Sequence, residues 1–364
     1  MERPGGIVTL SERFQGFATW CEGTSPLYER LARGVADDPD LLDLAAAVPE
    51  GRSPPHVLLA GVHYLLLDGC EHPLADYYAS VTGDPADPTV DDPVAAFREF
   101  CLEHESALRE LLTTWRTQTN SVRRCAALYP AFARVSAAVD GQPLSLIEVG
   151  SSAGLNLLWD RYAYEYADER AATDGDEGPG DPIRVGPDDA TVVVESSLRD
   201  GDPPLPVNPP EVASRQGIDL NPLDVTDESD ARWLRALTWP EHESRRRLLD
   251  AALERARANP PEIRAGDALA VLPDLLDATA DPVVVFNTQT LYQFTEDERE
   301  QFRTLLAENG TGRELHWLSG EHGVESDEPE IRLQWATATD GRLVPEQLLA
   351  YEQHGRWIRW VEDA

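Results

Sequence analysis

The chain has 364 residues, 41% of them apolar, which is enough for a large buried core and for more than one domain. Asp and Glu number 66 against 31 Lys and Arg, which gives a formal net charge of −35, and every strong base is arginine. Such a charge repels nucleic acid and anionic lipid, so neither is an expected partner.

The acidic residues are dispersed along the chain and do not form blocks. At molar salt the Debye length falls to about 3 Å, so repulsion among dispersed charges is screened. The composition therefore indicates a halophilic protein, with the acidic character of a proteome adapted to salt. We expect a cytoplasmic location.

Removal of salt should destabilise this protein, because repulsion among its excess negative charges is then unscreened. We expect the melting temperature to rise steadily from dilute buffer to molar potassium chloride. A melting temperature that does not change over this range would contradict the halophilic interpretation.

Neither a metal site nor a membrane segment is expected. The longest apolar run, Val57–Leu67, is interrupted by His63 and is shorter than the about 20 residues that span a bilayer. The first residues have neither the basic nor the apolar region of a signal peptide. The four cysteines lie far apart, form no C-x-x-C pair and are predicted to be buried free thiols: Cys21, Cys70, Cys101 and Cys125.

Apolar residues recur at helical spacing from Leu10 to about Val139, and no strand pattern appears before Leu144. The sequence thus predicts an all-helical domain over 1–140, with six or seven helices. An α/β domain is predicted to follow over 141–364.

The α/β part begins with a strand pattern at Leu144–Val149, followed by a loop rich in glycine and serine and by an apolar helical repeat. A strand, a tight turn and a helix in this order point backbone N–H groups into a small space at the carboxyl end of the strand. Glycines let the backbone approach a ligand there, and Glu148 can accept hydrogen bonds from an amine or a sugar hydroxyl.

Two functional interpretations compete for this loop, besides the possibility that it is only a crossover with small residues. Glu148 to Gly154 resembles the acid-x-Gly-x-Gly-x-Gly motif of S-adenosylmethionine (SAM) dependent methyltransferases, with Ser152 in place of the middle glycine. Gly150 to Gly154 also matches the Gly-x-Ser-x-Gly nucleophile elbow of α/β-hydrolases. The elbow follows several strands and needs an oxyanion-hole loop, whereas no strand or His-Gly-Gly run precedes this loop. We therefore expect no histidine within hydrogen-bond distance of Ser152.

Further strands are predicted along the chain. Residues at about 163–215 are interpreted as a small antiparallel β insertion over the glycine loop, with a loop at 174–182. Asp219 ends the second core strand, where an acid can bind ribose hydroxyls or simply cap a turn before Pro222. Asp267 and Ala268 follow the third strand, in a sequence that resembles the Gly-Asp-Ala motif that holds adenine.

Pro282–Phe286 is a continuous apolar run typical of a buried parallel strand. Asn287 follows it, either to orient a substrate or as a loop residue. Leu315–Ser319 is predicted as the next strand, and Ile331–Thr337 with Arg356–Val361 as a terminal antiparallel hairpin. Together these elements predict a Rossmann-like class I SAM-methyltransferase sheet, mostly parallel.

Four parts of the chain resemble the domain of unknown function 2332 family: residues 148–162, 217–222, 237–240 with the following 245–249, and 265–268. The resemblance covers most of the chain and implies a SAM-methyltransferase-like fold without an established reaction. It also implies a histidine near the position of Asn287, which this chain lacks, so no catalytic residue is assigned.

The favoured hypothesis is a SAM-dependent methyltransferase acting on an unknown small molecule, because the sulfonium of SAM activates the methyl group and the protein mainly aligns donor and acceptor. The alternative is a non-catalytic SAM- or nucleotide-binding protein, and the third hypothesis is a serine hydrolase using Ser152. No oligomeric state follows from the sequence. The residues predicted to bind the cofactor are Glu148, Gly150, Ser151, Ser152, Gly154, Asn156, Asp219, Asp267, Ala268 and Asn287.

Overall fold

The computed structural model describes residues 8–118, 120–169, 181–322, 330–339 and 341–361. The first residues and most of the predicted loop at 174–182 lie outside these ranges. The chain forms two compact units, one of residues 1–119 with 227–247 and one of residues 120–226 with 248–364. The first unit therefore consists of two segments of the chain, 1–119 and 227–247. The sequence had predicted a single boundary near residue 140.

The described part of the first unit is helical. Thr9 begins α1 with a capping box to Glu12, and Ser25 begins α2 by accepting the amide hydrogen of Tyr28. The helices are α1 (Leu10–Cys21), α2 (Pro26–Asp37), α3 (Pro39–Ala45), α4 (Pro54–Leu67), the 3₁₀ helix η1 (Pro73–Tyr77), α5 (Val94–Glu103), α6 (Glu105–Thr114) and α8 (Glu228–Ala236). The division between the units falls within α9 (Glu243–Arg257). Within the described ranges, no helix has the length and apolar character needed to cross a membrane.

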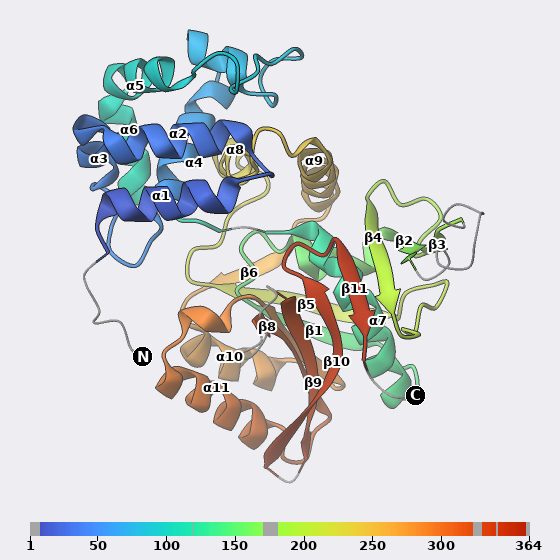
Figure 1. Ribbon diagram of the computed structural model, residues 1–364. Coiled ribbons are helices and arrows are strands. Elements are labelled where there is room, and N and C mark those ends of the chain that lie inside the picture. The colour runs from blue at the N-terminus through green and yellow to red at the C-terminus, as the bar shows by residue number, and fades with distance from the viewer. Residues whose placement is uncertain (1–7, 119, 170–180, 323–329, 340, 362–364) are drawn as a thin grey trace, which may run out of the picture. The chain divides into compact units, whose positions relative to one another are not determined.

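The second unit contains one eleven-stranded sheet, in the order β3-β2-β4-β11-β10-β9-β8-β7-β1-β5-β6 (Figure 1). Its strands are β1 (Leu144–Val149), β2 (Ala163–Asp168), β3 (Ile183–Val185), β4 (Val193–Asp200), β5 (Val212–Asp219), β6 (Glu262–Ala265), β7 (Val283–Thr288), β8 (Leu315–His322), β9 (Glu330–Thr339), β10 (Arg342–Glu352) and β11 (Trp357–Trp360). The sheet is mostly parallel, since β6, β5, β1, β7 and β8 run in one direction.

Strand β1 lies at the centre of these parallel strands. Glu148 near its end is in register with Gly217 of β5 on one side and with Phe286 of β7 on the other. The chain continues from β1 to β5 on one side and returns later to β7 on the other, which makes the β1–β7 junction a topological switch point. In open α/β sheets, ligands bind outside the carboxyl ends of strands at such a junction.

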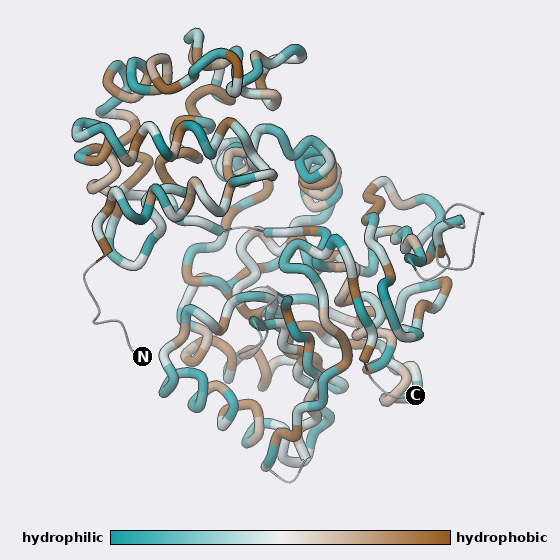
Figure 2. The backbone as a smooth tube through the Cα atoms, viewed as in Figure 1, coloured by the Kyte–Doolittle hydropathy of each residue, from teal (hydrophilic) through white to brown (hydrophobic). Residues whose placement is uncertain are grey.

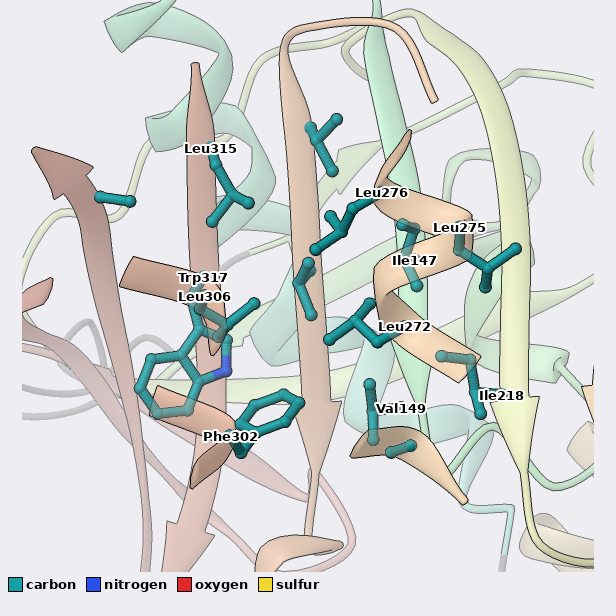
Figure 3. Packing of buried hydrophobic residues seen from close by; sticks show 14 of the residues in the cluster. Ile147, Val149, Ile218, Leu272, Leu275, Leu276, Phe302, Leu306, Leu315 and Trp317 are labelled. Atoms are coloured by element: carbon teal, nitrogen blue, oxygen red, sulfur yellow. The ribbon is translucent and has the colours of Figure 1, made fainter. Parts of the chain in front are cut away.

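Helices cover both faces of the parallel strands. α10 (Ala268–Ala278) and α11 (Glu296–Asn309) bury Leu272 and Phe302 against Ile147 of β1 and Trp317 of β8 (Figure 3). On the other face, α7 (Cys125–Ala138) places Phe132 against Phe286 of β7. Figure 2 shows hydrophilic and hydrophobic segments alternating along α11, as expected for a helix with one buried face.

Two predicted strand arrangements are wrong. The predicted hairpin partners, Ile331–Thr337 and Arg356–Val361, do not pair with each other, because β10 lies between them and is antiparallel to both. The insertion is not purely antiparallel either, since β2 and β4 are parallel and β4 joins the main sheet through β11. Alternation of apolar and polar residues identifies strands but does not identify their neighbours.

Candidate functional site

The glycine loop after β1 has left-handed backbone at Gly150 (φ +77°), Ser152 (φ +53°) and Gly154 (φ +71°). This conformation directs its amides towards β5. Gly150 N and Ser151 N both donate to Ile218 O, at 2.8 and 3.2 Å, and Ser152 N donates to Asp219 Oδ2 at 2.8 Å. The prediction that these amides point at a ligand is therefore wrong, because the protein itself uses them.

The residue that approaches Gly150 is Thr290, in the loop after β7. A Cβ at position 150 would lie 2.3 Å from Thr290 Oγ1, well inside van der Waals contact. The space beside Gly217 is likewise occupied, since a Cβ there would lie 2.5 Å from Ser151 Oγ. The glycines are thus required for packing between the loops at the carboxyl ends of β1, β5 and β7.

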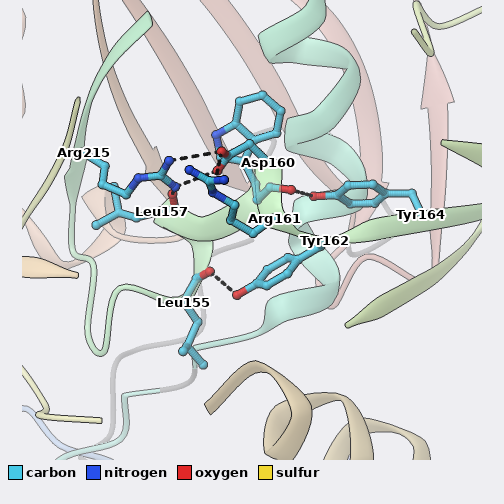
Figure 4. A network of polar contacts seen from close by, with 8 residues as sticks. Leu155, Leu157, Asp160, Arg161, Tyr162, Tyr164 and Arg215 are labelled. Carbon is cyan, nitrogen blue, oxygen red and sulfur yellow. Dashed lines mark hydrogen bonds and ion pairs between the residues drawn. The ribbon is translucent and has the colours of Figure 1, made fainter. Parts of the chain in front are cut away.

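The element after the loop is a 3₁₀ helix, η3 (Leu155–Arg161), and not the predicted α-helix. Side chains take the carbonyl groups that an α-helix would use itself: Arg215 of β5 donates to Leu157 O at 2.8 Å, and Tyr162 Oη donates to Leu155 O at 2.7 Å (Figure 4). Arg215 also forms an ion pair with Asp160 at 2.7 Å. A helix of seven residues aligns few peptide dipoles, so it attracts an anion less than a long α-helix would.

Glu148 is a fully buried acid in this site, with 1% of its surface exposed. Asn156, on η3, donates from Nδ2 to Glu148 Oε1 at 3.4 Å. Burial raises the pKa of Glu148 well above its ordinary range; the Asn156 hydrogen bond lowers it, Asp219 raises it and Arg124 lowers it. Burial therefore disfavours the charged form of this carboxyl group unless a cation approaches it.

Three buried oxygen atoms in the loop region have no hydrogen-bond partner among the described residues: Glu148 Oε2, Ser151 Oγ and Ser152 Oγ. Buried polar atoms are nearly always paired, so these atoms mark a place where water or a ligand binds. No described histidine is hydrogen-bonded to Ser152, and His316 instead contacts Thr337 Oγ1 at 3.2 Å. A hydrolytic nucleophile would need such a base.

The predicted acids at the ends of β5 and β6 lie together. The carboxylate of Asp219 accepts amide hydrogens from Ser152 and Asn221, so this residue caps a turn. Its backbone carbonyl accepts the amide hydrogen of Gly266 at 2.9 Å. Asp267 is the N-cap of α10 and accepts Leu269 N at 2.8 Å. Ala268 begins α10, where a helix leaves backbone N–H groups without intrahelical partners. The structure therefore brings the glycine loop, Asp219 and Asp267 into one continuous edge.

Asn287, unlike the other residues predicted to bind the cofactor, has its side-chain amide bonded to Trp317 and Glu321. It is fully buried; its Oδ1 accepts from Trp317 Nε1 at 2.8 Å and its Nδ2 donates to Glu321 Oε1 at 2.8 Å. Glu321 Oε1 also accepts Thr290 N and Leu291 N, each at 2.9 Å. Asn287 is thus part of the support of the β7 loop, which Glu321 holds in place over Gly150.

Sequence reasoning missed Glu321 as the support of this loop, and it missed Arg124. Arg124 ends the short helix η2 (Val122–Arg124) and is 7% exposed. It donates from Nη1 to Thr288 O at 3.3 Å and from Nε to Gln353 O at 3.1 Å. Gln289, which has a positive φ of 53°, donates to the same Gln353 carbonyl at 2.7 Å. The sequence signal for Arg124 was an arginine pair, Arg123 and Arg124, directly before the apolar helix α7. A charged side chain at such a position is costly to bury.

The molecule is thus an α/β protein whose buried polar groups gather at the carboxyl edge of a mostly parallel sheet. Within the described residues, no group of three or more His, Cys, Asp or Glu side chains is arranged to hold a metal ion. The chain belongs to the family described as "Uncharacterized protein conserved in bacteria (DUF2332)", which it matches over residues 11–360. No curated protein and no solved structure matches the chain.

Proposed function

We propose that this protein binds SAM at the carboxyl edge of β1, β5 and β6 and transfers its methyl group to a small molecule. The observation that carries the proposal is the balance of donors and acceptors at this edge. The amides of Gly150, Ser151 and Ser152 are already bonded, whereas Glu148 Oε2 has no partner among the described residues. A ligand that supplies donors or positive charge suits this balance, and a dinucleotide pyrophosphate does not.

The arrangement of strands supports the same proposal. Numbered along the chain, the parallel strands β6, β5, β1, β7 and β8 follow the order 3-2-1-4-5, which is the order of Rossmann-like sheets. In the proposal, the ammonium of SAM lies by Glu148, the ribose near Asp219 and the adenine near Asp267 and Ala268. Asn156 keeps Glu148 oriented through its hydrogen bond. Bound SAM supplies an electrophilic methyl group, and the protein aligns it with the acceptor.

Binding without catalysis is the alternative function. Asn287 is the residue at the end of β7 that was predicted to orient a substrate or to be a loop residue, and both ends of its amide are hydrogen-bonded within the protein. A protein that binds SAM tightly but transfers no methyl group to any small-molecule acceptor would support this alternative.

At a pH below the raised pKa of Glu148, binding of SAM should release a proton, because the carboxyl group must ionise to pair with an ammonium group. Affinity is therefore expected to rise with pH until the pH exceeds the raised pKa of Glu148 in the free protein. Calorimetric titration with SAM in molar potassium chloride, in two buffers of different ionisation enthalpy, measures the released proton directly.

Glu148→Gln is the matched variant, since it keeps the shape of the side chain and an acceptor for Asn156. We expect it to abolish proton release and to weaken SAM binding roughly ten- to a hundredfold. In the absence of ligand the variant should be at least as stable as the wild type above pH 4.5, since a raised carboxyl pKa means that ionisation opposes folding there. The proposal is wrong if NAD binds and SAM does not.

A further inference from the structure

Arg124 and Glu148 form an unusual pair on the α7 face of the sheet. They are 7% and 1% exposed. Cys125, the residue after Arg124, donates from Sγ to Asn156 Oδ1 at 3.4 Å, and Asn156 donates to Glu148 Oε1 at 3.4 Å, so the two groups lie in one connected region. Among the described residues no carboxylate forms an ion pair with Arg124, whose hydrogen bonds go to backbone carbonyl groups. A buried charge without a partner costs several kcal/mol. The structure leaves the Arg124 guanidinium without a direct counterion, near an acid whose Oε2 atom has no hydrogen-bond partner.

The orientation of Arg124 is fixed by two backbone carbonyl groups. Its Nε and Nη1 atoms donate to Gln353 O and Thr288 O, which belong to the β10–β11 turn and to the end of β7. These acceptors are neutral, so they hold the guanidinium without compensating its charge. A guanidinium held in this way is a preorganised planar donor for a carboxylate.

We propose that Arg124 and Glu148 together recognise the two charges of an α-amino-acid group, the carboxylate at Arg124 and the ammonium at Glu148. The inference rests on the proposed function and adds a specificity to it: the ligand must carry the amino-acid carboxylate of SAM. A zwitterion brings a carboxylate to Arg124 and an ammonium group with which Glu148 can ionise, whereas a simple amine leaves Arg124 uncompensated. Arg124 is then the specificity-determining residue of the site.

Burial and electrostatics are consistent with this assignment. Burial lowers the pKa of Arg124, so the surroundings disfavour its charge unless an anion approaches; Tyr351, Glu321, Tyr292 and Glu148 act in the opposite direction. Buried interactions are screened by salt much less than exposed ones, so recognition should persist in molar potassium chloride.

The test compares SAM with decarboxylated SAM, S-adenosyl-3-methylthiopropylamine, which keeps the sulfonium, the adenosine and an amine but lacks the carboxylate. We expect wild-type protein to bind SAM ten- to a hundredfold more tightly in calorimetric titrations. Arg124→Met should bind the two compounds with similar affinity. Arg134→Met is the control: it removes a guanidinium from α7 that packs on the Trp335 ring at 4.6 Å, and it should keep the preference for SAM.

Each outcome decides between the two proposals. Equal affinities of the wild type for both compounds would overturn the assignment of Arg124 while leaving SAM binding intact, as would an Arg124→Met variant that keeps the preference. Failure of both compounds to bind would overturn the proposed function and this inference with it. The wild-type comparison is decisive even where Arg124→Met lowers stability.

Discussion

Replacement of Glu321 with alanine is expected to lower the free energy of unfolding by about 3–6 kcal/mol, one of the largest effects of a single substitution in this protein. Glu321 Oε1 accepts hydrogens from Asn287 Nδ2, Thr290 N and Leu291 N, and the alanine variant leaves all three donors without an acceptor. Each orphaned donor costs roughly 1–3 kcal/mol, less what water recovers. Urea denaturation in molar potassium chloride measures the loss.

Glu321→Gln is the matched control. Its amide oxygen can take the place of Oε1 and accept the same three hydrogens, so most of the stability should return. If the alanine and glutamine variants were equally unstable, the loss would arise from the charge and not from the hydrogen bonds. If both were as stable as the wild type, Glu321 would not support the β7 loop at all.

Replacement of Asp267 with asparagine is expected to weaken SAM binding roughly ten- to a hundredfold with little effect on folding. Asp267 caps α10 through Oδ1, and asparagine is an equally good N-cap residue. The substitution replaces the other carboxylate oxygen, the proposed acceptor of the adenine amine, with an NH₂ group that is itself a donor. Calorimetric titration gives the affinity and a thermal melt gives the stability.

Asp227→Asn provides a control with the same chemistry outside the proposed site. Asp227 is the N-cap of α8 and accepts Ser229 N at 2.8 Å and Asp230 N at 3.1 Å. This variant should bind SAM like the wild type. Unchanged affinity in a folded Asp267→Asn variant would remove Asp267 from the site.

The parallel strands and their loops could be predicted from the sequence because their signals are local. The apolar run before Asn287 forms β7, and the alternation of strand and loop places Glu148, Asp219 and Asp267 at one edge of the sheet. The positions of these carboxylates follow from the rule that parallel strands end at the same edge.

Pairing and partners could not be predicted because they depend on residues far apart in the chain. The strand β10 separates the two predicted hairpin strands. The loop amides donate hydrogen bonds to Ile218 and Asp219, which lie more than sixty residues further along the chain. The 3₁₀ conformation of η3 depends on Arg215, which no local helical pattern reveals.

The ends of the sheet have a consequence for how this protein behaves at high concentration. A wide sheet with long exposed edges is a template for strands of other chains, and short or charged edge strands reduce that risk. Among the described residues the outermost strands of the sheet are β3, of three residues, and β6, of four residues. Arg184 lies within β3, and Glu262 and Arg264 lie within β6, so each edge offers little backbone to an incoming strand and carries charge beside it. In molar salt, where charge repulsion between molecules is screened, the shortness of these outermost strands still limits their pairing with other chains.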